Sequence, residues 1–162
     1  MLRFASAFAF TLLTAVLLTG CSGMYVNIPH QPGDIASENP NNERVRDLVA
    51  KACTAVIEDN NLPGPVAIKM PDTTSRRTDK IIASRVKGAI SPAAQTKPQP
   101  ATVLKVVGIR IRGSSGEVDM RAPTRGGSEM AVLHSIEANY SAFTHWTVQT
   151  VNVWPGVREG YE

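Results

Sequence analysis

The last third of this 162-residue chain alternates between apolar and polar residues over four successive segments. Alternation with a period of two places every second side chain on the same face of a strand. In the last segment the alternation slips near Thr150, which predicts a β-bulge. Short turns rich in Gly or Ser separate the segments, so the sequence predicts a four-stranded antiparallel meander. The four predicted strands are residues 103–112, 117–122, 130–140 and 146–153.

An amphipathic helix is predicted for residues 43–59, where apolar residues recur at helical spacing from Val45 to Ile57. Asn41 or Asn42 is placed to cap its first turn, and Pro63-Gly64-Pro65 ends the pattern. A short strand at 66–70 and a more basic helix at 75–87 follow. We therefore expect an α+β fold in which the four-stranded antiparallel meander carries the N-terminal amphipathic helix on one face, together with a second helix. The layout resembles no family closely enough to transfer residues.

The N-terminus has the arrangement of an export signal. One positive charge in residues 1–3 precedes an uncharged apolar run from 4 to 19. The run is shorter than the roughly 20 residues that a membrane-spanning helix needs. Leu18-Thr19-Gly20-Cys21 closes it, and these four residues resemble the lipobox of bacterial lipoprotein signal peptides. A plain secretory signal or a short membrane helix followed by a chance cysteine is the alternative.

The resemblance implies that the Cys21 sulfur carries a diacylglyceryl group and that cleavage occurs before Cys21. The freed amine is often acylated too, and palmitate is an expected acyl group of such lipoproteins. Stable anchoring needs two acyl chains rather than one, and the diacylglyceryl group supplies both. The implied location is the extracytoplasmic side of a bacterial cell membrane or outer membrane, and Ser22 resembles the pattern of release to the outer membrane. Membrane lipid is thus the first expected partner.

Three parts of the chain follow from these patterns. Residues 1–20 are the expected signal peptide, 21–42 a lipidated tether rich in Pro, Asn and Gly, and 43–162 a single α+β domain. Tyr25 and Ile28 are the tether residues that could instead pack on the domain. Cys53 is then the one thiol left outside the anchor, and its place at the edge of the apolar helix face predicts a buried structural role.

Charge is distributed in blocks along the chain. Residues 76–125 hold eleven Lys or Arg against three Asp or Glu, which is a net +8. Strict alternation places Arg110 and Arg112 on one face of the first predicted strand, with Arg121 beside them on the next. These three arginines form a candidate anion-binding patch for an anionic glycan or lipid. The alternative is an ordinary solvated sheet face. The same alternation places Leu104 and Val106 on the face of Arg110 and Arg112. It places four residues on the opposite face: Val103, Val107, Ile109 and Ile111.

No motif for catalysis, cofactor binding or nucleotide binding occurs in the sequence. The three histidines, His30, His134 and His145, lack the spacing of metal ligands, although His134 and His145 could meet across the last hairpin. His134 lies on an apolar strand face, which favours a hydrogen-bonded core histidine. No phosphate-binding glycine loop or G-x-S-x-G elbow is present. We therefore expect neither a metal nor a cofactor.

The function that these observations favour is a membrane-anchored envelope lipoprotein with a small, non-enzymatic binding or structural domain. Its protein partner would lie in the envelope, and nucleic acid is not expected there. Two alternatives stay open: an envelope enzyme with an unrecognised site, and an assembly accessory that adds a strand from a partner to its sheet edge.

Overall fold

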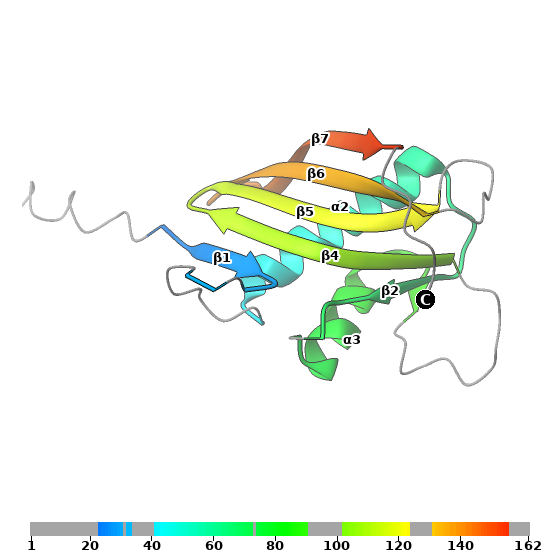
Figure 1. The fold of residues 1–162 in the computed structure, drawn as a ribbon, viewed down its shortest axis with the longest axis horizontal. Helices are drawn as coiled ribbons and strands as arrows, with labels where there is room; N and C mark the ends of the chain where they lie inside the picture. The colour runs from blue at the N-terminus through cyan, green and yellow to red at the C-terminus, as the bar shows by residue number, and fades with distance from the viewer. Residues whose placement is uncertain are drawn as a thin grey trace, which may run out of the picture.

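The computed structural model describes residues 23–30, 32–33, 41–72, 74–90, 102–123 and 131–155. In these residues, two helices lie on one face of a seven-stranded mixed sheet (Figure 1). The α+β class predicted from the sequence is confirmed. The strands are β1 (Tyr25–Ile28), β2 (Val66–Lys69), β3 (Ala89–Ile90), β4 (Thr102–Arg112), β5 (Ser115–Pro123), β6 (Ala131–Ser141) and β7 (His145–Trp154).

The predicted meander forms only part of the sheet. Strands β4 to β7 are consecutive antiparallel neighbours, as the short turns predicted. The sheet continues past β4, because β2 pairs parallel to the first half of β4 and β3 pairs parallel to β2. Strand β1 lies beside the second half of β4 and runs antiparallel to it. The predicted sheet, with four antiparallel strands, therefore lacked three strands of the observed sheet. Two of them, β1 and β3, are too short to show a periodic pattern.

Two β-bulges set which side chains reach the core. In β4 the pairing shifts between Val106 and Gly108, so Val107 has no partner on β5. The shift moves Leu104 and Val106 onto the same buried face as Ile109 and Ile111, and the predicted division of this strand into faces was wrong. The bulge predicted in the last strand is present, because the partners of Thr150 and Val148 are consecutive residues of β6.

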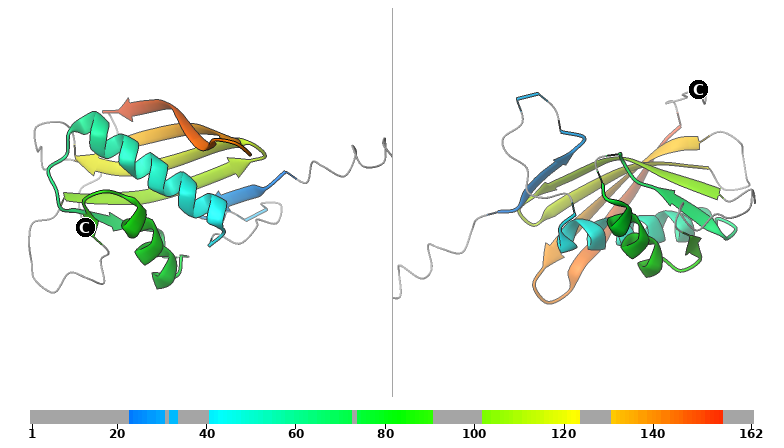
Figure 2. Two further views of the ribbon diagram at one scale, coloured as in Figure 1. Left: turned by 180° about the vertical axis from the view of Figure 1, so that it is seen from behind. Right: turned by 90° about the horizontal axis from the view of Figure 1, so that it is seen from below.

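Helix α2 (Glu43–Asn60) covers the apolar face of the sheet, running obliquely across it (Figure 2). The Asn42 side chain caps it by accepting a hydrogen bond from the Arg44 amide at 2.9 Å. Asn61 ends it in the left-handed conformation at φ 48°. Its inner face packs against β4, β5, β6 and β7 and includes Leu48, Val49 and Cys53.

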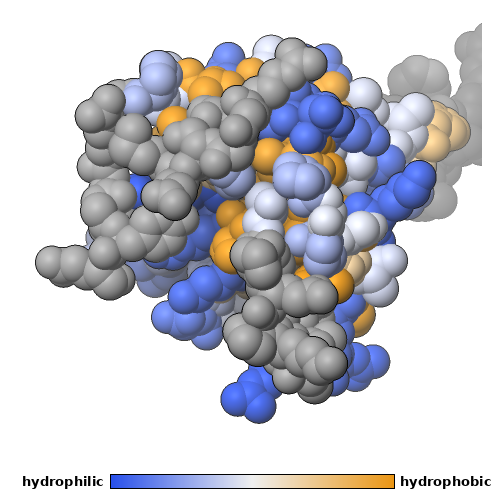
Figure 3. Space-filling model, turned by 90° about the vertical axis from the view of Figure 1, so that its right-hand side faces the viewer, coloured by the Kyte–Doolittle hydropathy of each residue, from blue (hydrophilic) through white to orange (hydrophobic). Residues whose placement is uncertain are grey.

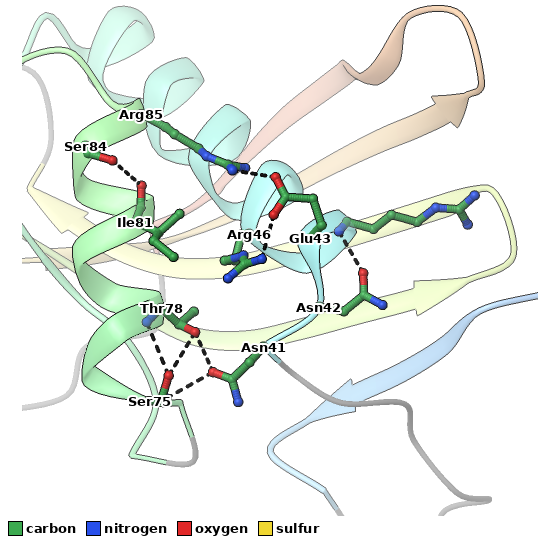
Figure 4. Close-up of polar contacts among 10 residues, drawn as sticks. Asn41, Asn42, Glu43, Arg46, Ser75, Thr78, Ile81, Ser84 and Arg85 are labelled. Atoms are coloured by element: carbon green, nitrogen blue, oxygen red, sulfur yellow. Dashed lines mark hydrogen bonds and ion pairs between the residues drawn. The ribbon is translucent and has the colours of Figure 1, made fainter.

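Helix α3 (Arg76–Arg85) packs beside α2 and β2. Its N-terminus is tied to that of α2 through Asn41, whose Oδ1 accepts from the Ser75 amide at 3.1 Å and from the Thr78 hydroxyl at 2.5 Å (Figure 4). Glu43 adds ion pairs with Arg85 and Arg46. Hydrogen bonds from Arg85 and then from Arg46 lower the pKa of Glu43. Helix α3 therefore packs against the rest of the domain through Ile82, which is buried in the core.

Cys53 is fully buried on the inner face of α2, as its position on the helix predicted. Burial in an apolar environment raises the pKa of its thiol to about 12. A protonated and inaccessible thiol is unreactive, so Cys53 has a packing role.

The segment predicted as a tether, residues 21–42, contains ordered structure. Strand β1 pairs with β4 in register from Tyr25 opposite Arg112 to Ile28 opposite Ile109. Met24, Val26 and Ile28 are buried in the core. Residues 25–28 are therefore part of the sheet, and the alternative in which Tyr25 and Ile28 pack on the domain is the one observed.

Candidate functional site

The sheet face that the helices leave open carries a network of charged residues centred on Arg110. Its guanidinium donates to Glu117 from Nε at 3.0 Å and from Nη2 at 2.6 Å, and Nη2 also donates to Asp119 at 2.6 Å. The Ser135 hydroxyl donates to the second oxygen of Asp119 at 2.6 Å. The bidentate hydrogen bond from Arg110 lowers the pKa of Glu117, and the same bond raises the pKa of Arg110. Arg110 is therefore held between two carboxylates.

The three arginines of the predicted anion patch do not form one cluster. Arg110 and Arg112 line a depression of about 520 Å³ over β4 to β7, together with Glu117 and Glu137. Arg121 is not among its lining residues and lies further along the sheet, opposite Lys105 and Leu133. Arg112 extends over the Tyr25 ring, with its guanidinium carbon 5.9 Å from the ring centroid. Two acidic side chains thus accompany two basic ones, and anion binding here stays a prediction.

A second depression lies at the N-terminal end of α2, against the β6–β7 hairpin. Its volume is about 660 Å³, and its lining includes Glu43, Arg44, Asp47, Tyr140 and His145. The Arg44 guanidinium carbon lies 4.1 Å from the centroid of the Tyr140 ring. His145 Nδ1 is 4.0 Å from Asp47 Oδ2, a distance for an ion pair with a protonated histidine but too long for a hydrogen bond. Sequence analysis missed this grouping, because Asp47 and Tyr140 come from distant elements.

His145 adopts a left-handed backbone conformation at φ 54°, which is uncommon for a residue other than glycine. The conformation belongs to the tight turn between β6 and β7. Within the described residues, the Ser141 and Thr144 hydroxyls of this turn hydrogen-bond to each other at 2.7 Å. Within the same ranges, no three His, Cys, Asp or Glu side chains gather closely enough to hold a metal ion.

His134 and His145 lie at opposite ends of the hairpin. His134 pairs with Val153, whereas His145 pairs with Ser141, so the two rings do not meet. His134 is 0% exposed, and neither ring nitrogen has a hydrogen-bond partner. Burial lowers the pKa of His134. This effect is larger than the opposing effects of the Asp59 charge and the Ala122 backbone, which both raise the pKa. The predicted core position is confirmed, without the expected hydrogen bond.

We expect the buried His134 to make the folded state less stable in mild acid. Its pKa is lowered in the folded state, so below about pH 6.5 the unfolded chain binds more protons. In this window the free energy of unfolding should decrease as the pH is lowered, by up to about 1.4 kcal/mol per pH unit for one proton. His134→Leu should flatten that slope in urea denaturation series, and also raise stability at neutral pH because it removes an unpartnered polar ring.

The matched control is Met120→Leu, which changes a buried side chain paired with His134 and removes no titratable group. It should leave the slope unchanged. An equal slope in the natural chain and in His134→Leu would contradict the assignment.

The outer edge of β7 pairs with no strand of the described residues. The strand is ten residues long, and His145 is its one ionisable side chain. Natural edge strands are usually protected by Lys, Pro or a short length, and β7 has only the bulge near Thr150. An unpaired edge of this kind is the feature to which an extended partner strand adds in β-augmentation.

Comparison of this chain with protein families, with curated proteins and with solved structures gives no match. The class of protein is therefore defined by its own features: an α+β domain with a mixed sheet, helices on one face and a polar face on the other. Cys21 lies outside the described residues. Neither described helix has the length and apolar character to cross a bilayer.

Proposed function

We propose that this chain is a lipid-anchored protein of the bacterial cell envelope, on the extracytoplasmic side, with a non-enzymatic binding or structural domain. The observation that carries the proposal is the position of Cys21. It closes a lipobox-like sequence, and only Ser22 separates it from Gly23, where the described structure begins. Met24, three residues after Cys21, is buried in the core, so the proposed anchor lies close in sequence to the folded domain.

Replacement of Cys21 by serine tests the anchor. Serine has no thiol to form the thioether, so Cys21→Ser should abolish incorporation of radiolabelled palmitate and leave the signal peptide uncleaved. Processing is read as the mass of the N-terminal peptide, and location as the fraction of protein that pellets with membranes. Cys53→Ala is the matched control, because the buried thiol takes no part in acylation. Label that persists in Cys21→Ser would refute the proposal.

Strand addition at β7 is the second candidate function, favoured by its long, nearly uncharged free edge. In this role the lipid holds the domain at the membrane while a partner strand extends the sheet. Photo-crosslinking in cells from position 147, an exposed residue of β7, would capture such a partner. Equal capture from an exposed position on α2 would argue against the edge. An enzyme is the weaker alternative: the depression beside α2 holds both Thr54 and His145, but the Thr54 hydroxyl donates to the Ala50 carbonyl at 2.9 Å rather than to a base.

A further inference from the structure

The chain enters the fold at one end of the sheet, packed on the turn between β4 and β5. The Met24 carbonyl accepts a hydrogen bond from the Gly113 amide at 2.9 Å. A Cβ atom on Gly23 would lie 3.3 Å from Gly113 Cα, so the two backbones are in close contact. Two residues of chain span at most about 7 Å. Cys21 therefore cannot lie far from the β4–β5 turn, whatever conformation Ser22 adopts.

The most exposed large apolar side chain of the described residues lies at this same end. Phe143 is 96% exposed in the turn between β6 and β7. The turn is held by the Ser141 hydroxyl, which accepts from the Thr144 amide at 3.0 Å. The Tyr140 amide donates to the Ser114 carbonyl at 2.7 Å, which joins the two turns. Figures 1 and 2 show both turns at the end of the sheet where β1 enters.

The two turns themselves carry no negative charge, although Glu43 and Asp47 line the depression beside the β6–β7 hairpin. Neither the β4–β5 turn nor residues 141–144 contain an acidic residue. Arg112 lies over Tyr25, and Arg44 lies over Tyr140, so two aromatic rings support guanidinium groups near the turns. A basic side chain close to an anionic leaflet contributes about 1 kcal/mol of attraction.

We propose that this end of the sheet faces the lipid leaflet and that Phe143 inserts into its interface beside the acyl chains of Cys21. The inference rests on the proposed lipid anchor. A single exposed phenylalanine ordinarily needs no explanation. Here the length of chain between Cys21 and Gly23 holds the sheet end within reach of the 5–10 Å layer (about the depth that interfacial apolar groups occupy). The domain then rests on the membrane with the long axis of its strands directed away from it.

The opposite end of the sheet also exposes apolar surface, visible among hydrophilic residues in Figure 3. Trp154, at the end of β7, is 53% exposed, and Val103, at the start of β4, is 43% exposed. Because β1 enters at the far end from these residues, an anchor on Cys21 directs them away from the lipid. A probe at the β6–β7 turn should therefore lie in the lipid interface, whereas a probe at the opposite end of the sheet should lie in water.

The test places an environment-sensitive fluorophore on the full, lipidated chain in vesicles of equal parts phosphatidylethanolamine and phosphatidylglycerol. Phe143→Cys carries the probe at the proposed contact, and Glu58→Cys carries it at an exposed site near the C-terminal end of α2. The buried Cys53 does not compete for the label. We expect blue-shifted emission and several-fold stronger quenching by nitroxide-bearing lipids at position 143 than at position 58.

Labelling position 143 removes the phenylalanine, so a second measurement keeps it. The probe on Ala142→Cys should be quenched by the lipid nitroxide when Phe143 is present and lose most of that quenching in the Phe143→Ser background. Equal quenching at positions 143 and 58, or an Ala142→Cys probe indifferent to Phe143→Ser, would overturn the inference while palmitate incorporation leaves the anchor intact. A chain without lipid on Cys21 would overturn both.

Discussion

Trp146→Ala is expected to destabilise the fold by about 3–5 kcal/mol, the range for deletion of a buried aromatic side chain. Trp146 is 2% exposed on β7 and lies between the sheet and the first turns of α2. Its Nε1 donates to the Arg44 carbonyl at 2.8 Å, and the Tyr140 ring packs edge-on with its centroid 5.2 Å away. The substitution removes the side chain that joins the edge strand to the helix. Circular dichroism during urea denaturation measures the loss.

Trp154→Ala provides the matched control, because Trp154 is the same residue type on the same strand but 53% exposed. Its cost should stay below about 1 kcal/mol, as for other surface substitutions. Trp146→Phe keeps most of the packing and should lose about 1 kcal/mol with the Nε1 hydrogen bond. Equal costs for the two Trp→Ala variants would contradict the assignment of Trp146 to the core.

The elements with strong local periodicity were predicted well from the sequence. The apolar spacing of 43–59, the N-cap signal at Asn41 or Asn42 and the stop at Pro63-Gly64-Pro65 locate α2, because the pattern and its signals are all local. The four long strands were predicted to within two residues at each end for the same reason. The class of fold follows from these elements, since a helix and a sheet with matching apolar faces must pack together.

The remaining strands depend on contacts that no local pattern contains. Strand β1 has four residues and β3 has two, and both gain their place from pairing with distant partners. The bulge at Val107 reversed the predicted faces of the first half of β4 only, because one extra residue changes the phase of all the residues before it. Alternation alone cannot locate such a residue, although Gly108 beside it is a weak signal.

The candidate sites were predictable only in part. Arg110 and Arg112 do share the open sheet face, but the carboxylates that neutralise Arg110 come from β5 in a register that the turn residues alone did not fix. Phe143 was treated as part of a connection, because exposure of one turn residue depends on the surrounding fold. Its nearness to the chain entry follows from the pairing of β1, which the sequence did not reveal.

Gly116→Ala is expected to cost about 1–3 kcal/mol, the usual range for overpacking a tight core. Gly116 was predicted to belong to a turn, but it lies within β5 beneath α2. A Cβ atom there would lie 2.8 Å from Leu48 Cδ2 and 2.8 Å from two carbons of the Trp146 indole. Leu48 and Trp146 are both buried, so neither side chain can rotate into solvent to make room. Ser115→Ala, next in the strand and exposed, should change stability by less than about 0.5 kcal/mol.

A double-mutant cycle with Trp146→Leu isolates the cause of that cost. Leucine lacks the two indole carbons that the new methyl group would meet, so Gly116→Ala should become milder in the Trp146→Leu background. Residues in direct contact typically give coupling energies of about 0.5–3 kcal/mol, and relief of the clash predicts the favourable sign here. The Leu48 contact persists, so some cost should remain. Strictly additive free energies of unfolding across the cycle would show that the glycine is required for another reason than the close approach of the Trp146 ring.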